Sequence, residues 1–395
     1  MRNIIITGGG LVNKGAQAMI YITVSELRRR FPEHKIYLLT SEAITVDDLH
    51  INDKNIELLS WHPLKFARAQ SNLLLKAICS IKNSKEYKYT RSVYGNCDLM
   101  VDISGYSLGS NWPDKICNDF LDNIEYAISF DVPVVLLPQS FGPFDFPNDS
   151  LVDKRIRKLL PRVRIICARE KDGYDSLISE YGLKNVVMRP DIVLSSSIDY
   201  NSCGLFKYPS VDPVRSNSVA LIPNENLLKF TDKDGLMNVY KGVISHLTAA
   251  GDNVYLVFHS NNDRVLCEEI KAVCGNNEKL FLADKDLSCV EFNELVKGFK
   301  YCVASRFHSI VHSFKNGIPC ISLGWAVKYK DLLHEFGQDD YLIDASVGLD
   351  LNGIIERIDR MENRCGIESG IILSALENVQ KQSVFDILDE VIEIK

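Results

Sequence analysis

The amino-acid sequence predicts an α/β protein with two Rossmann-like domains that face a cleft. Three observations support this prediction. Short apolar runs alternate with amphipathic helical stretches, the alternation occurs in two separate series, and a segment rich in Asn, Ser, Gly and Pro at residues 195–218 lies between the series. Strands that are buried on both faces and connected by helices form parallel sheets. The length of 395 residues also suits two domains better than one.

The first series begins with an apolar run at residues 4–7, a glycine-rich turn and a helical pattern at residues 16–31. The apolar positions of this helix recur with a period of 3.6 residues, and Pro32 closes it. Further strands are predicted at residues 35–40, 98–103, 132–138 and 164–168, and further helices at residues 64–81, 117–130 and 171–181.

The second series follows the irregular segment. Strands are predicted at residues 219–222, 253–258, 280–282, 301–304 and 319–323, helices at residues 232–250, 263–273, 290–299 and 308–316, and two closing helices at residues 351–361 and 371–394. The predicted organisation is an N-terminal domain at residues 1–200, a linker at 201–217, a C-terminal domain at 218–365 and a C-terminal helix at 366–395.

Composition excludes several classes of protein. Asp and Glu outnumber Lys and Arg by 52 to 45, so no nucleic-acid partner is expected, and an anionic ligand needs a local cluster of cations. The 11 cysteines are scattered and form no CxxC pair, which predicts reduced residues of a cytoplasmic protein and no zinc ribbon. No apolar stretch approaches the roughly 18 residues of a membrane-spanning helix.

The glycine-rich turn at residues 8–15 matches neither common phosphate-binding pattern. Asn13 stands where the dinucleotide fingerprint has its third glycine, and Ala16 and Gln17 stand where a P-loop has Lys and then Ser or Thr. The backbone amides of the turn still suit a hydroxyl-rich or anionic ligand, and Asn13 and Gln17 add polar groups for sugar hydroxyls. The alternative is a tight turn that binds no ligand.

Three polar residues of the first series stand at the ends of predicted strands. These residues are Asp102, Gln139 and Arg169. Ligands of open α/β sheets bind outside the carboxyl ends of the strands, so all three are candidate binding residues. The structural alternatives are a cap on the following loop for Asp102 and a salt bridge with a neighbouring acid for Arg169.

The strongest cluster of the second series is Ser305, Arg306 and His308, at the junction of a predicted strand and helix. Ser305 is predicted to cap the helix, so that free amides, the helix dipole, a guanidinium and an imidazole converge on one point. This combination suits a phosphate or a carboxylate. His259 ends an earlier strand, and Lys328 adds a cation at the start of a later helix.

A metal site is not predicted. His308 and His312 are four residues apart, as two zinc ligands on a helix would be, but Ser309 stands where the metalloprotease pattern has Glu. The sequence offers no evident third ligand. His312 is therefore interpreted as a core or interface residue.

These motifs together resemble the polysaccharide pyruvyl transferase family. The resemblance runs in order along nearly the whole chain, and two departures from the usual pattern are Ser104-Gly105 in place of Gly-Gly and the absence of an acid near Ala16. The residues that carry it are Asn13-Lys-Gly-Ala-Gln-Ala18, Gln139-Ser-Phe-Gly-Pro143, Ala168-Arg-Glu170, Pro190-Asp191, Phe258-His259, Ser305-Arg-Phe-His308, Gly317-Ile-Pro-Cys-Ile-Ser322, Lys328 and Phe336-Gly337.

The resemblance implies a fold like that of GT-B glycosyltransferases and phosphoenolpyruvate as the donor. The product would be a pyruvate ketal across two hydroxyls of a sugar, in a cell-surface polysaccharide or its lipid-linked precursor, with release of phosphate. The N-terminal domain would hold the acceptor and the C-terminal domain the donor. No cofactor is expected, because phosphoenolpyruvate is a substrate.

Roles for individual residues follow from these motifs. We expect His308 to act as the acid or as a proton donor on the phosphate side. Asp102 is the expected base for the sugar hydroxyl; Asp191 is the alternative base but is interpreted as structural, and a structural role is the alternative for Asp102 too. The residues expected to bind the donor are Arg169, Arg306, Lys328, Ser305 and His259. The residues expected to bind the acceptor are Asn13, Gln17 and Gln139.

Two other functions remain open from the sequence. A GT-B glycosyltransferase with a nucleotide-sugar donor would need a ribose-binding acid, for which Glu294 is a candidate that nothing singles out. A non-catalytic sugar- or anion-binding protein would not need the Arg306 and His308 pair. The predicted helix at residues 64–81 carries Lys65, Arg68 and Lys76 and is interpreted as an ordinary surface helix; the alternative is contact with the inner face of a membrane that bears a lipid-linked acceptor.

Overall fold

A computed structural model describes residues 2–11, 13–40, 50–60, 84–147, 149–200, 204–206 and 210–393. The helix predicted at residues 64–81 lies outside these residues. The chain divides into two units. The first unit contains Met1–Leu11, Met19–Lys207 and Gln382–Lys395, and the second contains Val12–Ala18 and Tyr208–Lys381.

The first unit is built on a parallel sheet of seven strands in the order β3-β2-β1-β4-β5-β6-β7. The strands are β1 (Asn3–Thr7), β2 (Lys35–Thr40), β3 (Ile56–Ser60), β4 (Cys97–Asp102), β5 (Val134–Gln139), β6 (Ile165–Ala168) and β7 (Val186–Met188). Every residue of β1, β4 and β5 is buried, as expected for central strands with helices on both faces.

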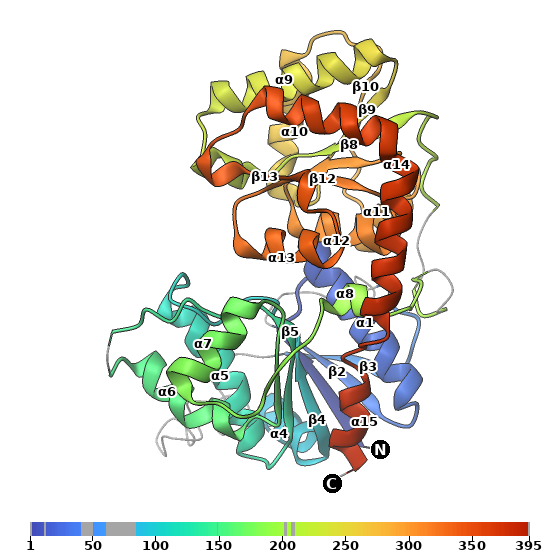
Figure 1. Cartoon of the computed structure of the whole chain (residues 1–395). Helices are drawn as coiled ribbons and strands as arrows, with labels where there is room; N and C mark the ends of the chain where they lie inside the picture. Colours follow the sequence, from blue (N-terminus) through green and yellow to red (C-terminus); the bar gives the residue numbers. More distant parts are fainter. Residues whose placement is uncertain are drawn as a thin grey trace. The chain divides into compact units, whose positions relative to one another are not determined.

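Helices cover both faces of this sheet (Figure 1). They are α1 (Lys14–Arg30), α4 (Ser84–Gly95), α5 (Asp114–Ile128), α6 (Leu151–Leu159), α7 (Lys171–Tyr181), α8 (Ile192–Ser195) and α15 (Asp386–Glu393). Arg30 near the end of α1 pairs with Asp386 and Asp389, so these contacts attach α15 to the first unit.

The second unit contains a parallel sheet of six strands in the order β10-β9-β8-β11-β12-β13. The strands are β8 (Ser218–Ile222), β9 (Asn253–Val257), β10 (Leu280–Ala283), β11 (Cys302–Ala304), β12 (Cys320–Gly324) and β13 (Leu342–Asp344). The helices are α9 (Lys233–Ala250), α10 (Arg264–Val273), α11 (Cys289–Val296), α12 (Phe307–Lys315), α13 (Val327–Glu335) and α14 (Leu351–Gln380).

Both sheets have the strand order of a Rossmann fold, in which the chain starts at a central strand, adds two strands on one side and then returns to the other side. In each unit, apolar side chains of the sheet and of its helices form a separate core. The α/β fold class predicted from the sequence is therefore confirmed. None of the described helices is long and apolar enough to cross a membrane.

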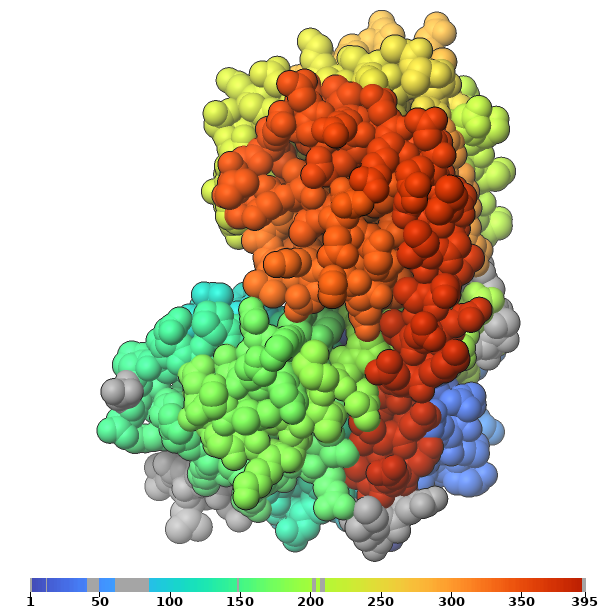
Figure 2. Space-filling model, in the orientation of Figure 1, coloured from blue at the N-terminus to red at the C-terminus, as the bar shows by residue number. Residues whose placement is uncertain are grey.

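The structure differs from the sequence prediction at a few elements. The strands β3, β7 and β13 and the helices α4, α6 and α8 were not predicted. The helix predicted at residues 371–394 is wrong as one element, because α14 ends at Gln380 and α15 begins at Asp386. The break predicted between residues 361 and 371 is wrong, because α14 continues through it and past position 365, where the sequence prediction ended the second domain. In Figure 2 this helix, coloured red, forms part of the surface of the second unit, and Ile367 and Leu373 are among its exposed residues.

Candidate functional site

The turn between β11 and α12 is held by Ser305, but not in the way that the sequence predicts. The N-cap of α12 is Arg306, and no side chain caps this helix end. The Ser305 hydroxyl donates instead to the carbonyl oxygen of Ile222 at 3.1 Å. The Ser305 carbonyl accepts from Tyr329 at 3.0 Å and from Asn224 at 3.1 Å. The predicted cap is therefore wrong, and the fully buried Ser305 fixes the turn that carries Arg306.

Arg306 is oriented by Asp263, a carboxylate with 0% of its side chain exposed. The guanidinium donates through Nε at 2.7 Å and through Nη2 at 2.6 Å to the two oxygens of Asp263. Asp263 also accepts from the backbone N–H of Glu225 at 3.1 Å, which fixes the carboxylate. The Arg306 side chain is 17% exposed, and its Nη1 group, unused by this pair, remains for a planar or tetrahedral anion.

The first turn of α1 lies against His308. A Cβ atom on Gly15 would stand 2.3 Å from both Cγ and Nδ1 of the His308 ring, so only glycine fits here without displacement. Asn13 caps this turn by accepting from the Gly15 N–H at 2.8 Å, and it forms an antiparallel bridge with Ser260 after β9. Gln17 accepts through Oε1 from the Cys289 N–H at 2.6 Å, at the start of α11.

The sequence predicts Asn13 and Gln17 as residues of the N-terminal domain, but their contacts are with the second unit. Both belong to Val12–Ala18, which groups with the second unit, where Arg306, His308 and Lys328 also lie. Their predicted contacts with a sugar acceptor therefore stay predictions. The structure brings them together with the residues predicted for the donor.

His259 is buried beside this group of cations. Among the described residues its Nε2 has no hydrogen-bond partner, and its ring stands 4.9 Å from that of Phe292 and 6.1 Å from that of His312. Burial, together with the neighbouring positive charge of His312, Lys14, His308 and Arg306, lowers the pKa of His259 well below its usual value. His259 is therefore neutral near pH 7 and acts as a dipole rather than as a cation.

Lys328 lies at the start of α13 and is half-buried. Its Nζ stands 5.2 Å from the centre of the Phe307 ring and 5.8 Å from that of Tyr329. These two aromatic faces hold the ammonium next to the turn that carries Arg306. Lys328, Arg306 and His308 are thus brought together as the sequence predicts.

Asp102 and Gln139 lie together in the first unit, at the carboxyl ends of β4 and β5. Asp102 accepts at 3.0 Å from both the backbone N–H and the hydroxyl of Ser104, and at 3.1 Å from Nε2 of Gln139. Burial raises the pKa of Asp102 to about 6, although these hydrogen bonds oppose the shift. Oε1 of Gln139 is buried without a partner among the described residues. The Asp102 carboxyl, which changes protonation state near pH 6, therefore lies beside Oε1 of Gln139, which can accept a hydrogen bond.

Arg169 is the centre of an ionic network in the first unit. Its guanidinium donates to Glu170 at 2.7 Å, to Asp191 at 2.9 Å and to the Ser140 hydroxyl at 2.7 Å. Asp191 also caps α8 through the N–H of Val193. This arrangement is the salt-bridge alternative that the sequence leaves open. Contact of Arg169 with the donor stays a prediction.

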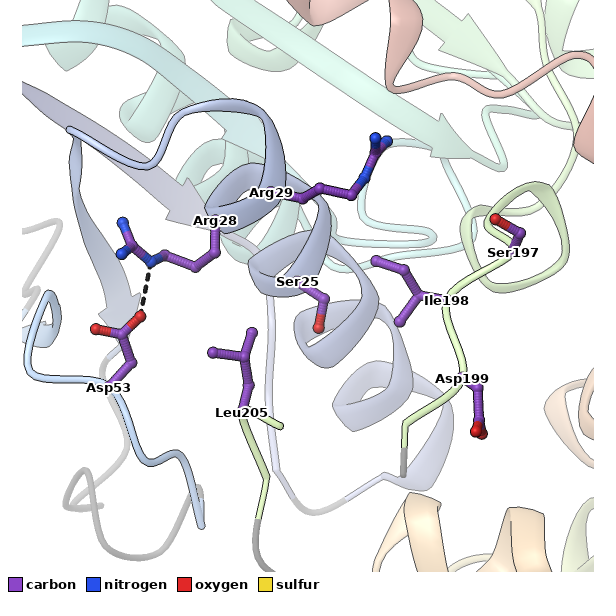
Figure 3. Close-up of a pocket in the computed structure, with 8 residues that line it drawn as sticks. All are labelled: Ser25, Arg28, Arg29, Asp53, Ser197, Ile198, Asp199 and Leu205. Atoms are coloured by element: carbon purple, nitrogen blue, oxygen red, sulfur yellow. Dashed lines mark hydrogen bonds and ion pairs between the residues drawn. The ribbon is translucent and has the colours of Figure 1, made fainter. Parts of the chain in front are cut away.

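Two pockets of the described structure lie away from these residues. One, of about 630 Å³, is lined by residues of the first unit that include Arg28, Arg29 and Asp53. Figure 3 shows Arg28 turned toward Asp53, to which it donates at 2.7 Å, while Arg29 points to the opposite side. Arg28 is paired with Asp53 and Arg29 with Glu26, so both arginines of this pocket already have a counter-ion. The second pocket, of about 300 Å³, lies around Tyr255 and Lys285.

Sequence reasoning missed two residues of the site. The sequence predicts Asp263 only as the first residue of a helix at residues 263–273, whereas the structure pairs it with Arg306, 43 positions away. Lys14 lies in the motif Asn13-Lys-Gly-Ala-Gln-Ala18, from which no role for the lysine is predicted, and the structure buries it in the second unit. A signal existed only for Lys14, because a lysine between Asn13 and Gly15 is unusual for a buried helix start. Among the described residues, no group of three or more His, Cys, Asp or Glu side chains could hold a metal ion.

Comparison with known proteins identifies the family and the fold. The model of a family described as polysaccharide pyruvyl transferase matches residues 13–326. A search of curated proteins found no significant match. Among solved structures, the UDP-GlcNAc 2-epimerase from Neisseria meningitidis bound to UDP-GlcNAc has a TM-score of 0.63 at 10% identity, with 100% of both chains covered.

Two further structures give the same result. A glycosyltransferase from Rickettsia africae has a TM-score of 0.57 at 13% identity, covering 100% of this chain and 97% of its own. The UDP-GlcNAc 2-epimerase from Methanocaldococcus jannaschii has a TM-score of 0.57 at 12% identity, covering 91% of this chain and 92% of its own. At these identities the similarity establishes a GT-B-like fold and nothing about ligands.

Proposed function

Since this chain belongs to the polysaccharide pyruvyl transferase family and is a transferase acting in pyruvyl transfer to polysaccharide, we propose that its donor is phosphoenolpyruvate and its product a pyruvate ketal. The ketal bridges two hydroxyls of one sugar, in a cell-surface polysaccharide or its lipid-linked precursor, and phosphate is released. The observation that carries the proposal is the cluster of Arg306, His308 and Lys328 at the carboxyl edge of the second sheet. The proposal needs no cofactor.

The charges of the cluster suit this donor. Phosphoenolpyruvate presents a phosphate and a carboxylate on either side of one enol carbon. Asp263 fixes Arg306 through Nε and Nη2, and the Nη1 group of the guanidinium remains for an oxygen of a carboxylate or phosphate. Lys328 supplies a point charge beside it. Ser305 supports this donor site by fixing the turn, and His259 offers a neutral imidazole.

The proposed reaction begins with a proton transfer. An acid, for which we propose His308, protonates the methylene carbon of the enolpyruvyl group and leaves an oxocarbenium-like centre on the neighbouring carbon. One sugar hydroxyl attacks this carbon and loses its proton to a base, for which we propose Asp102. The bond between this carbon and the phosphate oxygen then breaks. The second hydroxyl attacks the same carbon, gives its proton to the released phosphate and closes the ketal.

Incubation of the protein with phosphoenolpyruvate and a panel of candidate saccharides, followed by mass spectrometry, tests the proposal. The expected product is a saccharide that has gained one pyruvate and lost one water, with an equal amount of phosphate released. Thermal-shift titrations with phosphoenolpyruvate and with UDP- and GDP-sugars form the second arm. Stabilisation by nucleotide sugars and not by phosphoenolpyruvate would contradict the proposal and favour a glycosyltransferase.

Variants assign the roles within the cluster. His308→Ala should abolish turnover, while Arg306→Ala should chiefly raise the KM for phosphoenolpyruvate. His334→Ala and Arg360→Ala remove the same side-chain types from exposed ion pairs of the second unit and serve as matched controls. Turnover by His308→Ala at the wild-type rate would remove His308 from the mechanism.

A further inference from the structure

Lys14 is a buried cation in the second unit, and the counter-ion that it has among the described residues, Asp286, is half exposed. Its side chain is 4% exposed, and its Nζ stands 3.1 Å from Oδ1 of Asp286 and 5.3 Å from the centre of the Phe258 ring. An ammonium has three N–H donors, and among the described residues only Asp286 accepts from this one. The Asp286 side chain is 53% exposed, so water can solvate it if it leaves.

The backbone places Lys14 between two contacts of the proposed donor site. On one side, Asn13 pairs with Ser260, which follows the carboxyl end of β9. On the other side, Gly15 lies against the His308 ring. Lys14 thus stands at the sheet edge where ligands of this fold bind. The buried and unpartnered Nε2 of His259 is a second observation of an unsatisfied polar atom in this neighbourhood.

The cluster around Arg306 needs further positive charge to bind a donor with several negative charges, and Lys14 can supply it. Asp263 neutralises Arg306 and is itself fully buried, so it stays in place when a ligand binds. His259 is uncharged. A phosphate monoester carries a charge of about −1.5 to −2 at pH 7, and a carboxylate on the same ligand adds one more. Lys14, whose counter-ion Asp286 is half exposed, can therefore balance part of the ligand charge.

We propose that Lys14 binds an anionic group of the donor and that the donor anion replaces Asp286 as its partner. The identity of the donor as phosphoenolpyruvate rests on the proposed function, whereas the exchange itself applies to any phosphate- or carboxylate-bearing ligand of this cluster. Binding then transfers the Lys14 ammonium from one carboxylate to the ligand, and Asp286 turns into solvent. The buried side of Lys14, against Phe258, keeps the ammonium in position throughout.

Substitutions of the two partners, Lys14 and Asp286, should change the affinity for the donor in opposite directions. Lys14→Met removes the cation and should weaken binding of phosphoenolpyruvate about 10- to 100-fold, the usual cost of losing a charged hydrogen bond. Asp286→Asn removes the competing anion and should strengthen binding about two- to fivefold. If the pair only tied the first turn of α1 to the residues before α11, both substitutions would loosen the site and weaken binding.

The measurement is calorimetric titration of the full-length protein with phosphoenolpyruvate and with inorganic phosphate. Lys14→Arg keeps the charge and should retain most of the affinity, and circular dichroism checks that each variant is folded. Lys285→Met is the matched control, because Lys285 precedes Asp286 in the same loop, is exposed and pairs with Asp212. Its affinity should equal that of the wild type.

The outcomes separate this proposal from the proposed function. Wild-type affinity in Lys14→Met, or weaker binding in Asp286→Asn, overturns the role of Lys14 even when the wild type binds phosphoenolpyruvate and transfers pyruvate. A wild type that binds inorganic phosphate but neither binds nor turns over phosphoenolpyruvate contradicts the proposed function. In that case, loss of phosphate binding in Lys14→Met still supports the anion site.

Discussion

Individual residues of the candidate site are held by their neighbours in ways that sequence patterns do not reveal. The motif Ser305-Arg306-Phe307-His308 predicted the cations at the strand end correctly, because an apolar strand followed by polar residues is visible in one segment. The role of Ser305 was predicted wrongly, because the choice between a helix cap and a bond to Ile222 depends on a strand 83 positions away. The role of Asp263 was likewise not predictable from its own segment, because its partner Arg306 lies on another element.

Asp102 should make the stability of the first unit depend on pH. Its pKa is raised from 3.8 in the unfolded chain to about 6 in the folded one, chiefly by burial. The neutral acid is thus favoured by folding, so its contribution is complete below pH 3.8 and is lost as the pH rises through 6. The full loss is about 3 kcal/mol, of which about 2 kcal/mol falls between pH 4 and pH 8.

Urea unfolding of the wild type and of Asp102→Asn at each pH measures this effect. The substitution changes several hydrogen bonds at every pH, and other groups titrate in both proteins, so only the change in their difference with pH reports the ionisation of Asp102. A difference that stays constant from pH 4 to pH 8 would show that Asp102 has an ordinary pKa.

Gly15 should act as a positioning residue for His308. The Cβ of Gly15→Ala would stand 2.3 Å from the imidazole, so the ring or the turn must shift. Since a misplacement of about 1 Å at a reacting group costs about 100-fold in rate, kcat should fall by that order with a smaller change in KM. Alanine suits a helix better than glycine, so the melting temperature should not fall for reasons of backbone conformation.

The matched control for this prediction is Gly366→Ala in α14, where a Cβ meets no atom within 4 Å. That variant should keep full activity and gain about 0.5–1 kcal/mol of stability. The ring signals of His308 in a proton–nitrogen NMR spectrum should move in Gly15→Ala and stay in place in Gly366→Ala. Unchanged signals and kcat in Gly15→Ala would exclude the positioning role.

At the scale of elements, the prediction succeeded where periodicity is strong and failed at short or interrupted elements. The helix α7 was predicted with its observed bounds, and the bounds predicted for the central strands fall within two residues of those observed. The strands β7 and β13 have three residues each, too few for a pattern to stand out. The stretch between the two predicted helices contains Gly366 and Gly370, which lower helix propensity but do not end α14.

Glu368 should be one reason that α14 continues past these glycines. Its buried carboxylate accepts from Gln338 at 3.0 Å, from Tyr341 at 3.1 Å and from Arg364 at 2.7 Å. Glu368→Ala leaves the buried Gln338 amide and Tyr341 hydroxyl without this acceptor, so the free energy of unfolding should fall by about 3 kcal/mol.

Denaturant unfolding measures this change in stability, and two further variants serve as controls. Glu356→Ala changes an exposed glutamate on the same helix and should alter stability by less than about 0.5 kcal/mol. Glu368→Gln keeps an acceptor oxygen and should recover part of the loss. Equal stability of the two alanine variants would show that the Glu368 contacts contribute nothing.

At the scale of the whole chain, the sequence predicted two α/β halves, and the structure has two parallel sheets of Rossmann order. It did not predict that Val12–Ala18 groups with the second unit. The helical pattern of α1 is continuous from Lys14 to Arg30, so nothing in its periodicity marks the change after Ala18. Only the contacts of Asn13, Gly15 and Gln17 reveal it.

Hydrogen exchange in the presence of phosphate should test whether residues 12–18 belong to the anion site of the second unit. If the anion site is the one around Arg306, phosphate should slow exchange in residues 12–18, 258–263 and 305–309 together. Residues 102–107 and 139–143 of the first unit, which contain Asp102 and Gln139, should exchange at unchanged rates. The measurement is mass spectrometry of peptides with and without inorganic phosphate. Protection confined to the first unit would place the anion elsewhere.

The early position of Val12–Ala18 in the chain has a consequence for how such genes recombine. A DNA exchange that transfers only the region encoding Tyr208–Lys381 moves the six-stranded sheet but leaves behind the short peptide that carries Lys14 and Gly15. The resulting chimaera would combine cations from one parent with a supporting loop from the other. Hybrid enzymes designed to keep the proposed donor site intact should therefore exchange Val12–Ala18 and Tyr208–Lys381 together.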